Sequence, residues 1–301
     1  MKSKTLRVCF VILAIFVTAL NAVAQKTKMV IKPPRQIIFA VVSDGRLLEP
    51  IAYINKGRLE PPVNGSDETN LVKAFNKKYY KAGATYPLIF GGAIVGGVTV
   101  SKADAGSECS KNVATVVTKT NKTPLKGLVM GLATNAGVKS VVSTRRKPTA
   151  AERVEMDTLV KAEFLKEKLS GKELHYQNLT ALDVDEDGNV EFVGSYWVEI
   201  DKLTRGLLFF IAGKGSNGKY SVGYRDYHAV DQASVMSGVI KDVDDGVYHE
   251  LLLDVFDYDG DGTSEIFTYV QSFEGAGFNS YQRSGNTWVK NYDWANYHCA
   301  Y

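Results

Sequence analysis

The sequence predicts a mainly β protein with two helices, of the α+β class. Two observations support this prediction. Short runs rich in aromatic and β-branched residues, separated by glycine and asparagine turns, fill much of the 301-residue chain. Only two segments show the apolar spacing of a helix, and each is followed by a glycine.

The first 24 residues predict a secretory signal peptide. Three basic residues precede an apolar run from Val8 to Leu20, and Ala22-Val23-Ala24 supplies the small-residue pattern of a cleavage site. An uncleaved anchor is the alternative, although the run is shorter than the roughly 20 residues of a membrane span. After cleavage the protein is expected to be secreted, periplasmic or extracellular, with no transmembrane segment.

The charge of the mature chain is balanced. Three of the 36 basic residues lie in the leader, which leaves 33 basic and 33 acidic residues. A neutral chain gives no sign of the clustered basic surface that nucleic-acid-binding proteins need, so no nucleic-acid partner is expected. The short basic stretch Ser143–Pro148 is interpreted as a solvated linker.

Two cysteines, Cys109 and Cys299, remain after cleavage. An even number in an exported chain favours a disulfide, with two separate thiols as the alternative. The bond would close a loop of about 190 residues, for which the loss of chain entropy in the unfolded state gives roughly 5 kcal/mol at most.

The mature chain begins with an exposed lead-in, residues 25–35, followed by a strand-rich α+β unit over 36–145. A hairpin that turns at Asp44-Gly45 opens this unit. A helix then begins at Ser66 or Asp67, either of which can cap it. The side chains expected on its buried face recur at four-residue intervals and are Leu71, Phe75 and Tyr79.

The second helix lies in 146–171, a linker and capped helix. Thr149 and Glu152 have the spacing of a capping box, in which each side chain satisfies the other residue's backbone N–H. The expected apolar face consists of Met156, Leu159, Val160 and Phe164. Residues 172–301 then predict a β-domain that ends in an aromatic-rich hairpin, with an exposed aromatic row for sugars or partners as the alternative.

Two acidic loops in this β-domain share the spacing D-x-D-x-D-G-x-x-E and lie 74 residues apart. Alternate aspartates in a tight turn direct their carboxylates inward, and Ca²⁺ takes six to eight such oxygens. We therefore expect two Ca²⁺ sites, each with a backbone carbonyl after the glycine as a further ligand. The predicted ligands are Asp183, Asp185, Asp187, Asn189 and Glu191 in the first loop, and Asp257, Asp259, Asp261, Thr263 and Glu265 in the second.

Two alternatives stay open for these loops. They can be solvated acidic turns without metal, or they can hold an ion that serves only as a structural staple. An EF-hand does not fit, because Gly194 and Thr268 occupy the positions of its closing glutamate.

The loops resemble those of FG-GAP and VCBS-type repeats, which occur in integrin-like β-propellers and many exported bacterial proteins. The resemblance covers roughly 175–200 and 250–275. It implies that the loop aspartates bind calcium and tie neighbouring strands together. It also makes a partial or irregular β-propeller the alternative architecture, although a third loop and the family's phenylalanine-glycine and glycine-alanine-proline segments are missing.

No catalytic or cofactor-binding residue is assigned. Gly213–Gly218 matches G-x-G-x-x-G but precedes a predicted strand, so it is interpreted as a turn. His249–Leu253 lacks the second histidine of a zinc protease. Asp226 and His228 can share one strand face, and surface or packing roles are favoured for them.

We expect an exported, calcium-stabilised binding or surface-interaction protein, whose partner is an unknown protein or carbohydrate ligand at the cell exterior. A non-enzymatic role is favoured. The alternative is a secreted hydrolase with a site assembled from distant residues, and a purely structural envelope protein is a third hypothesis. A polar cluster in a pocket away from the loops would favour the hydrolase.

Overall fold

The computed structural model describes residues 35–103, 109–121, 125–140, 142–215, 217–235, 240 and 242–299. The expected signal peptide and all of the lead-in except Arg35 lie outside these residues. The described chain is mainly β, as the sequence predicts, and forms three antiparallel sheets and three α-helices, the third a single short turn. The alternative architecture, a β-propeller, is not shown by this part of the chain.

The first sheet contains β1 (Gln36–Val42), β2 (Leu47–Asn55), β3 (Arg58–Glu60), β4 (Thr85–Phe90), β5 (Ala93–Ala103), β6 (Ala114–Thr120) and β7 (Gly131–Thr134). The second contains β8 (His175–Leu182), β9 (Glu191–Asp201), β10 (Thr204–Lys214) and β11 (Tyr220–Asp231). The third contains β12 (Glu250–Phe256), β13 (Glu265–Ser272), β14 (Gly275–Ser284) and β15 (Thr287–Tyr297). The helices are α1 (Thr69–Tyr79), α2 (Ala150–Lys166) and α3 (Gln232–Val235).

The first sheet closes into a barrel of six strands. Its order is β1-β7-β4-β5-β6-β2-β3, and β1 also pairs with β2, so that only β3 extends beyond the closed ring. Alternate residues of β1 face opposite sides. Phe39 therefore points into the barrel, where Phe75 and Tyr79 of α1 join it, while Ile38 faces the third sheet. Gly96 lets β5 approach β6, because a Cβ there would lie 2.0 Å from the Lys119 carbonyl oxygen.

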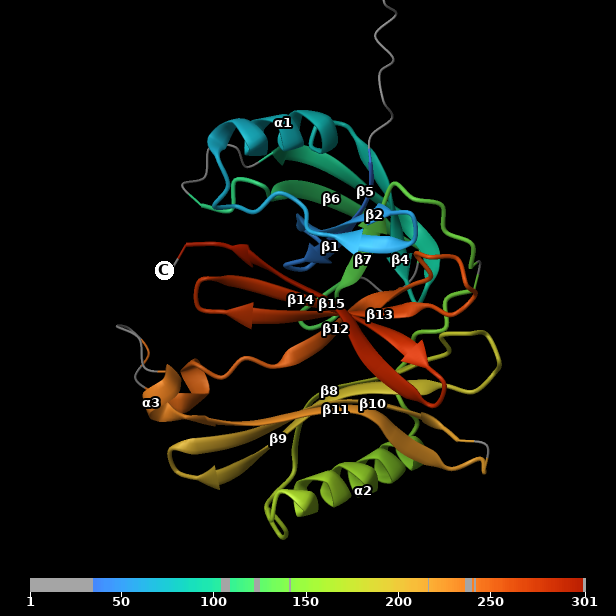
Figure 1. The fold of residues 1–301 in the computed structure, drawn as a ribbon, viewed down its shortest axis with the longest axis vertical. Coiled ribbons are helices and arrows are strands. Elements are labelled where there is room, and N and C mark those ends of the chain that lie inside the picture. Colours follow the sequence, from blue (N-terminus) through green and yellow to red (C-terminus); the bar gives the residue numbers. More distant parts are fainter. Residues whose placement is uncertain are drawn as a thin grey trace, which may run out of the picture. The chain divides into compact units, whose positions relative to one another are not determined.

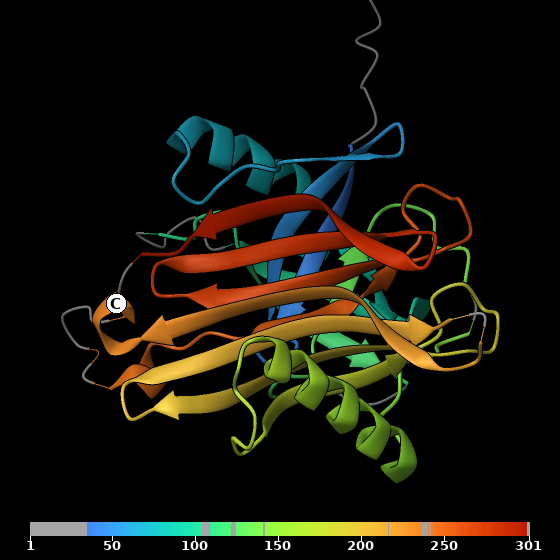
Figure 2. The ribbon, with the colours of Figure 1, turned by 60° about the horizontal axis from the view of Figure 1, so that its bottom comes forward.

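The second and third sheets are four-stranded meanders that pack face to face (Figures 1 and 2). Phe209 and Ile211 of β10 meet Leu252 of β12 and Tyr281 of β14 in this shared core. The other face of the second sheet is covered by α2, and the other face of the third sheet packs on the barrel. The layers thus run α1, barrel, third sheet, second sheet, α2, as Figure 1 shows.

The capping box of the second predicted helix is confirmed. The Thr149 hydroxyl accepts from the Glu152 backbone N–H at 3.3 Å, and the Glu152 carboxylate accepts from the Thr149 N–H at 2.7 Å. Met156 and Val160 on the predicted apolar face are fully buried. The division of the mature chain into 36–145, 146–171 and 172–301 stays a prediction.

Two details of the first predicted helix are wrong. The cap residue is Glu68, and its side chain makes no capping bond, because Asp67 instead accepts from the Asn64 N–H at 2.9 Å within the preceding turn. Leu71 is 54 % exposed, since Val72 occupies the buried face in its place. The helix therefore begins later and is rotated relative to the expectation from four-residue spacing.

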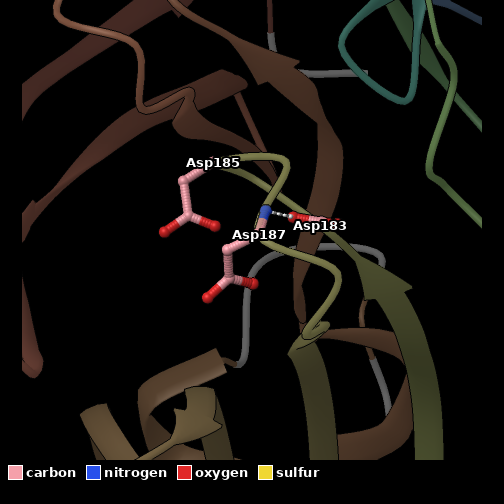
Figure 3. A group of neighbouring side chains, drawn as sticks. All are labelled: Asp183, Asp185 and Asp187. Atoms are coloured by element: carbon pink, nitrogen blue, oxygen red, sulfur yellow. Dashed lines mark hydrogen bonds between the residues drawn. The ribbon is translucent and has the colours of Figure 1, made fainter.

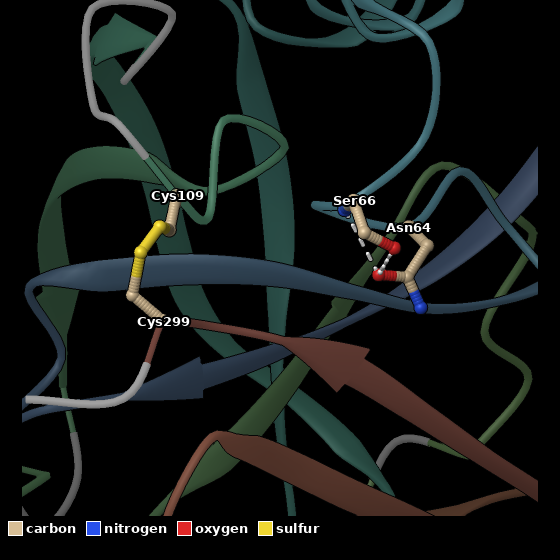
Figure 4. Close-up of a disulfide and its surroundings, with 4 residues drawn as sticks. All are labelled: Asn64, Ser66, Cys109 and Cys299. Atoms are coloured by element: carbon tan, nitrogen blue, oxygen red, sulfur yellow. Dashed lines mark hydrogen bonds between the residues drawn. A yellow bond between two sulfur atoms is a disulfide. The ribbon is translucent and has the colours of Figure 1, made fainter.

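The C-terminal strand is tied to the barrel covalently and through a buried polar network. Cys109 and Cys299 form the expected disulfide, with Cα atoms 5.3 Å apart (Figure 4). The buried Asn296 donates to Glu49 of β2 at 2.6 Å and accepts from Asn112 at 2.8 Å. The disulfide indicates an oxidising, exported environment. None of the described helices combines the length and apolar composition of a membrane span.

A buried ion pair joins the barrel and the third sheet to the linker Ser143–Pro148, so the expectation that this basic stretch is solvated is wrong at Arg145, whose side chain is 5 % exposed. The Arg145 guanidinium donates to Asp254 at 2.8 Å and to the carbonyl oxygens of Met130 and Leu253 at 2.8 and 2.7 Å. Asp254 is fully buried and also accepts from the Gly92 N–H at 3.1 Å. Three parts of the chain that are distant in sequence therefore meet at one guanidinium group.

We predict that Arg145→Met lowers the free energy of unfolding by about 3–5 kcal/mol, because it leaves the Asp254 charge buried without its partner. Arg146→Met is the matched control, since the Arg146 side chain is 41 % exposed and its pair with Glu152 is worth about 1 kcal/mol or less. Urea unfolding of both variants measures the difference. Equal losses in the two variants would contradict a central role for the buried pair.

Candidate metal centre

The first acidic loop connects β8 to β9, and one aspartate organises it. The Asp183 carboxylate accepts from the backbone N–H of Asp187 at 3.2 Å, as Figure 3 shows, and from that of Gly188 at 2.9 Å. Asp187 in turn accepts from the Asn189 N–H at 2.7 Å. These bonds wind the loop into a tight turn in which ligand atoms of Asp183, Asp185 and Asp187 all lie within 4.8 Å of one another.

The second acidic loop connects β12 to β13 and is built in the same way. Asp257 accepts from the N–H groups of Gly260 and Gly262, at 2.6 and 3.3 Å. Asp261 accepts from the Thr263 N–H at 2.8 Å. Here the ligand atoms within 4.8 Å of one another belong to Asp257, Asp259 and Glu265.

The backbones of the two loops adopt matching conformations at two equivalent positions. Glu186 and Gly260 occupy equivalent places and have positive φ of 58° and 84°, and so do Gly188 and Gly262, with 84° and 96°. These conformations favour glycine, so a glutamate at the first of these positions carries some strain. The shared spacing in sequence therefore corresponds to one shared turn.

A buried glutamate closes each loop. Glu191 and Glu265 are 2 % and 1 % exposed, and each accepts one backbone N–H at 3.3 Å, from Val184 and Tyr258 respectively. Burial raises the pKa of Glu191 to about 7 and the pKa of Glu265 to about 8, and the loop aspartates add to both shifts. Ionising these carboxylates is costly unless a positive charge lies beside them.

The two loops differ in the groups that β14 presents to them. Successive residues of a strand point to opposite faces, so Arg283 reaches the first loop and Gln282 the second. The Arg283 guanidinium lies 2.5 Å from Asp185 and 3.7 Å from Glu191. The Gln282 amide donates to Asp259 at 3.2 Å. The first loop thus has a cationic side chain on its carboxylates, whereas the second has a neutral one.

The loops contact each other and the linker. The Ser264 N–H at the end of the second loop donates to the Val184 carbonyl oxygen in the first, at 2.7 Å. From the linker, the Thr144 hydroxyl donates to the Asp183 carbonyl oxygen at 3.0 Å. Lys139 donates to the Gly260 carbonyl oxygen at 3.1 Å. Both loops therefore lie at one junction between the second sheet, the third sheet and the linker.

The structure brings together six of the ten predicted ligands in two groups of three. Glu191 and Asp261 belong to their loops but lie outside these groups, and the roles of the Asn189 and Thr263 carbonyls stay predictions. Sequence reasoning missed Arg283, Gln282 and Lys139. These residues are distant in the chain from the loops they contact, and no motif marks them.

Oxygen atoms make up each group, without nitrogen or sulfur donors. Such a set suits hard cations, so either loop could hold a metal ion. Comparisons with protein-family models, curated proteins and solved structures found no match to this chain.

The other motifs weighed in the sequence take ordinary structural places. Gly215 and Gly218 form the β10–β11 turn, where the Gly218 N–H donates to the Gly215 carbonyl oxygen at 2.9 Å. His249 directly precedes β12, and the residues that follow it, Glu250–Leu253, belong to that strand. The acidic stretch Asp242–Gly246, which lacks the spacing of a third loop, forms a short 3₁₀ turn, Val243–Asp245, capped by Asp242 accepting from the Asp244 N–H at 3.0 Å.

A pocket between β9–β11 and the start of β12 does contain polar residues. Its polar lining consists of Ser195, Asp226, His228, Tyr248, His249 and Glu250. Burial, with a smaller contribution from His228, lowers the pKa of His249 to about 4. The Glu250 carboxylate accepts from Thr268, Asn279 and Tyr281, at 2.5, 2.8 and 2.7 Å.

We predict that the cation-free protein becomes less stable as pH rises from about 5 to about 8. Because the pKa of Glu265 is raised above its ordinary value of 4.5, the folded state holds more protons than the unfolded state in this window, and the free energy of unfolding falls with pH. Glu265→Gln removes the titrating group and should flatten this decline.

Urea unfolding in EDTA at several pH values measures the effect. The wild type should lose at least about 1 kcal/mol more than Glu265→Gln across the window, since one pKa unit corresponds to about 1.4 kcal/mol. If the free energies of unfolding of the wild type and Glu265→Gln changed in parallel with pH, the raised pKa of Glu265 would be contradicted.

Proposed function

We propose that this chain is an exported, calcium-stabilised binding or surface-interaction protein in which each acidic loop holds one Ca²⁺. The observation that carries the proposal is the pair of matching turns, each with carboxylate oxygens around one point and a buried glutamate at its end. A bound cation would offset the charge that burial makes costly.

Calcium fits these loops better than other common cations. It accepts six to eight oxygens at about 2.3–2.6 Å in flexible geometry, whereas Mg²⁺ demands a near-ideal octahedron. Each loop offers four carboxylates and one backbone carbonyl, and bidentate carboxylates or waters can complete the shell. Zinc favours nitrogen and sulfur ligands, which neither group contains.

Membership of the FG-GAP and VCBS-type repeats is part of this proposal. Two features support it. Each loop lies in the first hairpin of a four-stranded antiparallel sheet, and equivalent residues of the two loops are 74 positions apart in the sequence. In that family the loops bind calcium and tie neighbouring strands. The Ser264–Val184 contact gives such a tie a physical route here, because each ion would rigidify one side of it.

The proposed location is the periplasm or the exterior of the cell, with an unknown protein or carbohydrate as the partner. The Cys109–Cys299 disulfide supports an oxidising compartment. Extracellular calcium modules have dissociation constants of about 10⁻⁴–10⁻³ M, and we expect these loops to fall in that range.

A secreted hydrolase is the second hypothesis, and the polar pocket is where its site would lie. Two contacts favour structural roles for pocket residues. The Ser195 hydroxyl donates to the Glu250 backbone carbonyl, and the Glu250 carboxylate already accepts three hydrogen bonds. Asp226, His228 and His249 would have to carry the chemistry, and binding therefore stays the favoured function.

We predict about two Ca²⁺ per wild-type chain, and about one in each of Asp187→Asn and Asp259→Asn, because each change removes a charged ligand from one loop. Glu186→Gln is the matched control. Glu186 is an acid of the first loop, but its carboxylate accepts from the Ser140 hydroxyl at 2.7 Å. The control should bind about two ions.

Titration calorimetry of EDTA-treated protein gives the stoichiometry, and thermal melts give the stabilisation. At free calcium about a hundredfold above Kd, each site should add about 2.7 kcal/mol. Full stoichiometry in both variants, or an identical melting temperature in EDTA and in calcium, would contradict the proposed ligands.

We also predict that the first loop binds calcium more weakly than the second, because Arg283 competes for its carboxylates. In an Asp259→Asn background only the first loop binds, and there Arg283→Gln should raise the calcium affinity roughly tenfold, or about 1.4 kcal/mol. Lys290→Gln is the control, since Lys290 lies over the Tyr281 ring. An unchanged or weakened affinity in Arg283→Gln would contradict this competition.

A further inference from the structure

The outer face of α1 carries a row of lysines. Its inner face, Val72, Phe75, Asn76 and Tyr79, is buried against the barrel. The opposite side is exposed, and Figure 2 shows the helix at the outside of the molecule. The exposed lysines of this helix and of the residues just after it are Lys73, Lys77, Lys78 and Lys81, which we call the α1 lysine face.

The arrangement concentrates like charges. Lys73 and Lys77 are four residues apart on α1 and so lie on one side of it, Lys78 lies about 100° further round the exposed face, and Lys81 follows the end of the helix. Like charges at this spacing repel each other by a few tenths of a kcal/mol. The negative end of the helix dipole accounts for lysines in the last turn but not for Lys73.

These lysines have no acidic partner among the described residues. The ion pairs of the described chain include none of them. The nearest acids along the chain, Asp67 and Glu68, lie before the helix, where Asp67 is engaged by the Asn64 N–H. Within the described residues, the partner of this charge is an aromatic ring, Tyr79 beneath Lys78, and not a carboxylate.

Two more lysines belong to segments whose backbones contact α1 or the residues after it. Asn76, on the buried face of α1, donates to the Lys111 carbonyl oxygen at 2.7 Å, which places the backbone of Lys111 beside the helix. The Gly83 N–H donates to the Val100 carbonyl oxygen at 2.9 Å, two residues before the exposed Lys102. Because the mature chain is expected to be neutral, this face is a local excess and not a reflection of overall charge.

We propose that the α1 lysine face docks on an anionic lipid surface. The outer face of a helix offers separated charges without a groove, so a broad charged surface complements it better than a small ligand does. Lysines act as point charges that attract phosphate groups diffusely, unlike the bidentate arginine that selects one phosphate geometry. Leu71, 54 % exposed at the side of the face, can enter the headgroup region.

This role is separate from the acidic loops and does not require calcium. Each lysine near an anionic membrane contributes roughly a fivefold gain in partition, so four together provide a gain of more than a hundredfold. The attraction acts within a Debye length and weakens with salt.

Sedimentation with vesicles tests the proposal. Purified protein is mixed with vesicles of phosphatidylcholine alone or with phosphatidylglycerol added, in EDTA and in calcium. We expect binding to the phosphatidylglycerol vesicles in EDTA, little binding to phosphatidylcholine alone, and loss of binding as salt rises. Replacing Lys73, Lys77, Lys78 and Lys81 with Gln should lower the partition at least tenfold.

Control variants make the result specific. The control variant loses the same number of positive charges from exposed positions elsewhere, and its vesicle partition should stay within about twofold of the wild type. It carries Gln at Lys161, Lys202, Lys219 and Lys290. Circular dichroism checks that both lysine variants fold. A further variant, Leu71→Ser, leaves the charge unchanged and should weaken binding to the vesicles severalfold.

The proposal would be overturned by no binding to anionic vesicles, by equal losses in the two lysine variants, or by binding to anionic polysaccharide beads without binding to vesicles. Binding that appears only in calcium would also overturn it, because the acidic loops would then be the bridge to the lipid. Failure of calcium to bind the loops would refute the proposed function but leave this assignment standing.

Discussion

Negative charge gathered at the junction of two sheets is the constraint on which this structure depends. Each acidic loop ends in a glutamate that is almost fully buried, and the two loops share a backbone hydrogen bond between Ser264 and Val184. Burying carboxylates disfavours their charged form unless a positive group compensates. The described chain places the Arg283 guanidinium on carboxylates of the first loop, whereas the Lys139 ammonium meets the second loop at a carbonyl oxygen. A cation in each loop would complete the compensation and fix the strand ends together.

The remaining layers position this junction. The third sheet is buried on both faces, by the second sheet and by the barrel, so its first hairpin has little freedom to move. Arg145 links the barrel and the third sheet from the linker, next to Thr144, which touches the first loop. The disulfide and the Asn296 network hold the far end of the same sheet to the barrel. The acidic loops are therefore attached to a sheet that the rest of the structure holds in place.

Local chemistry explains what could be predicted from the sequence. The capping box of α2 depends on two residues three apart, and the turns of the acidic loops depend on nine consecutive residues, so both are visible in the chain. Strands were predicted because aromatic and β-branched residues alternate. Closure of the barrel was not predicted, since it depends on the pairing of β1 with β7, about 100 residues away. Arg283 was missed for the same reason, because it meets Asp185 across 98 residues.

A crystal structure of the protein grown in calcium tests the central claim most directly. The account predicts one strong density peak in each loop, with carboxylate oxygens of Asp183, Asp185 and Asp187 or of Asp257, Asp259 and Glu265 at about 2.3–2.6 Å. It also predicts that Arg283 has moved away from Asp185. Carboxylates directed apart, with water in place of an ion in both loops, would contradict it.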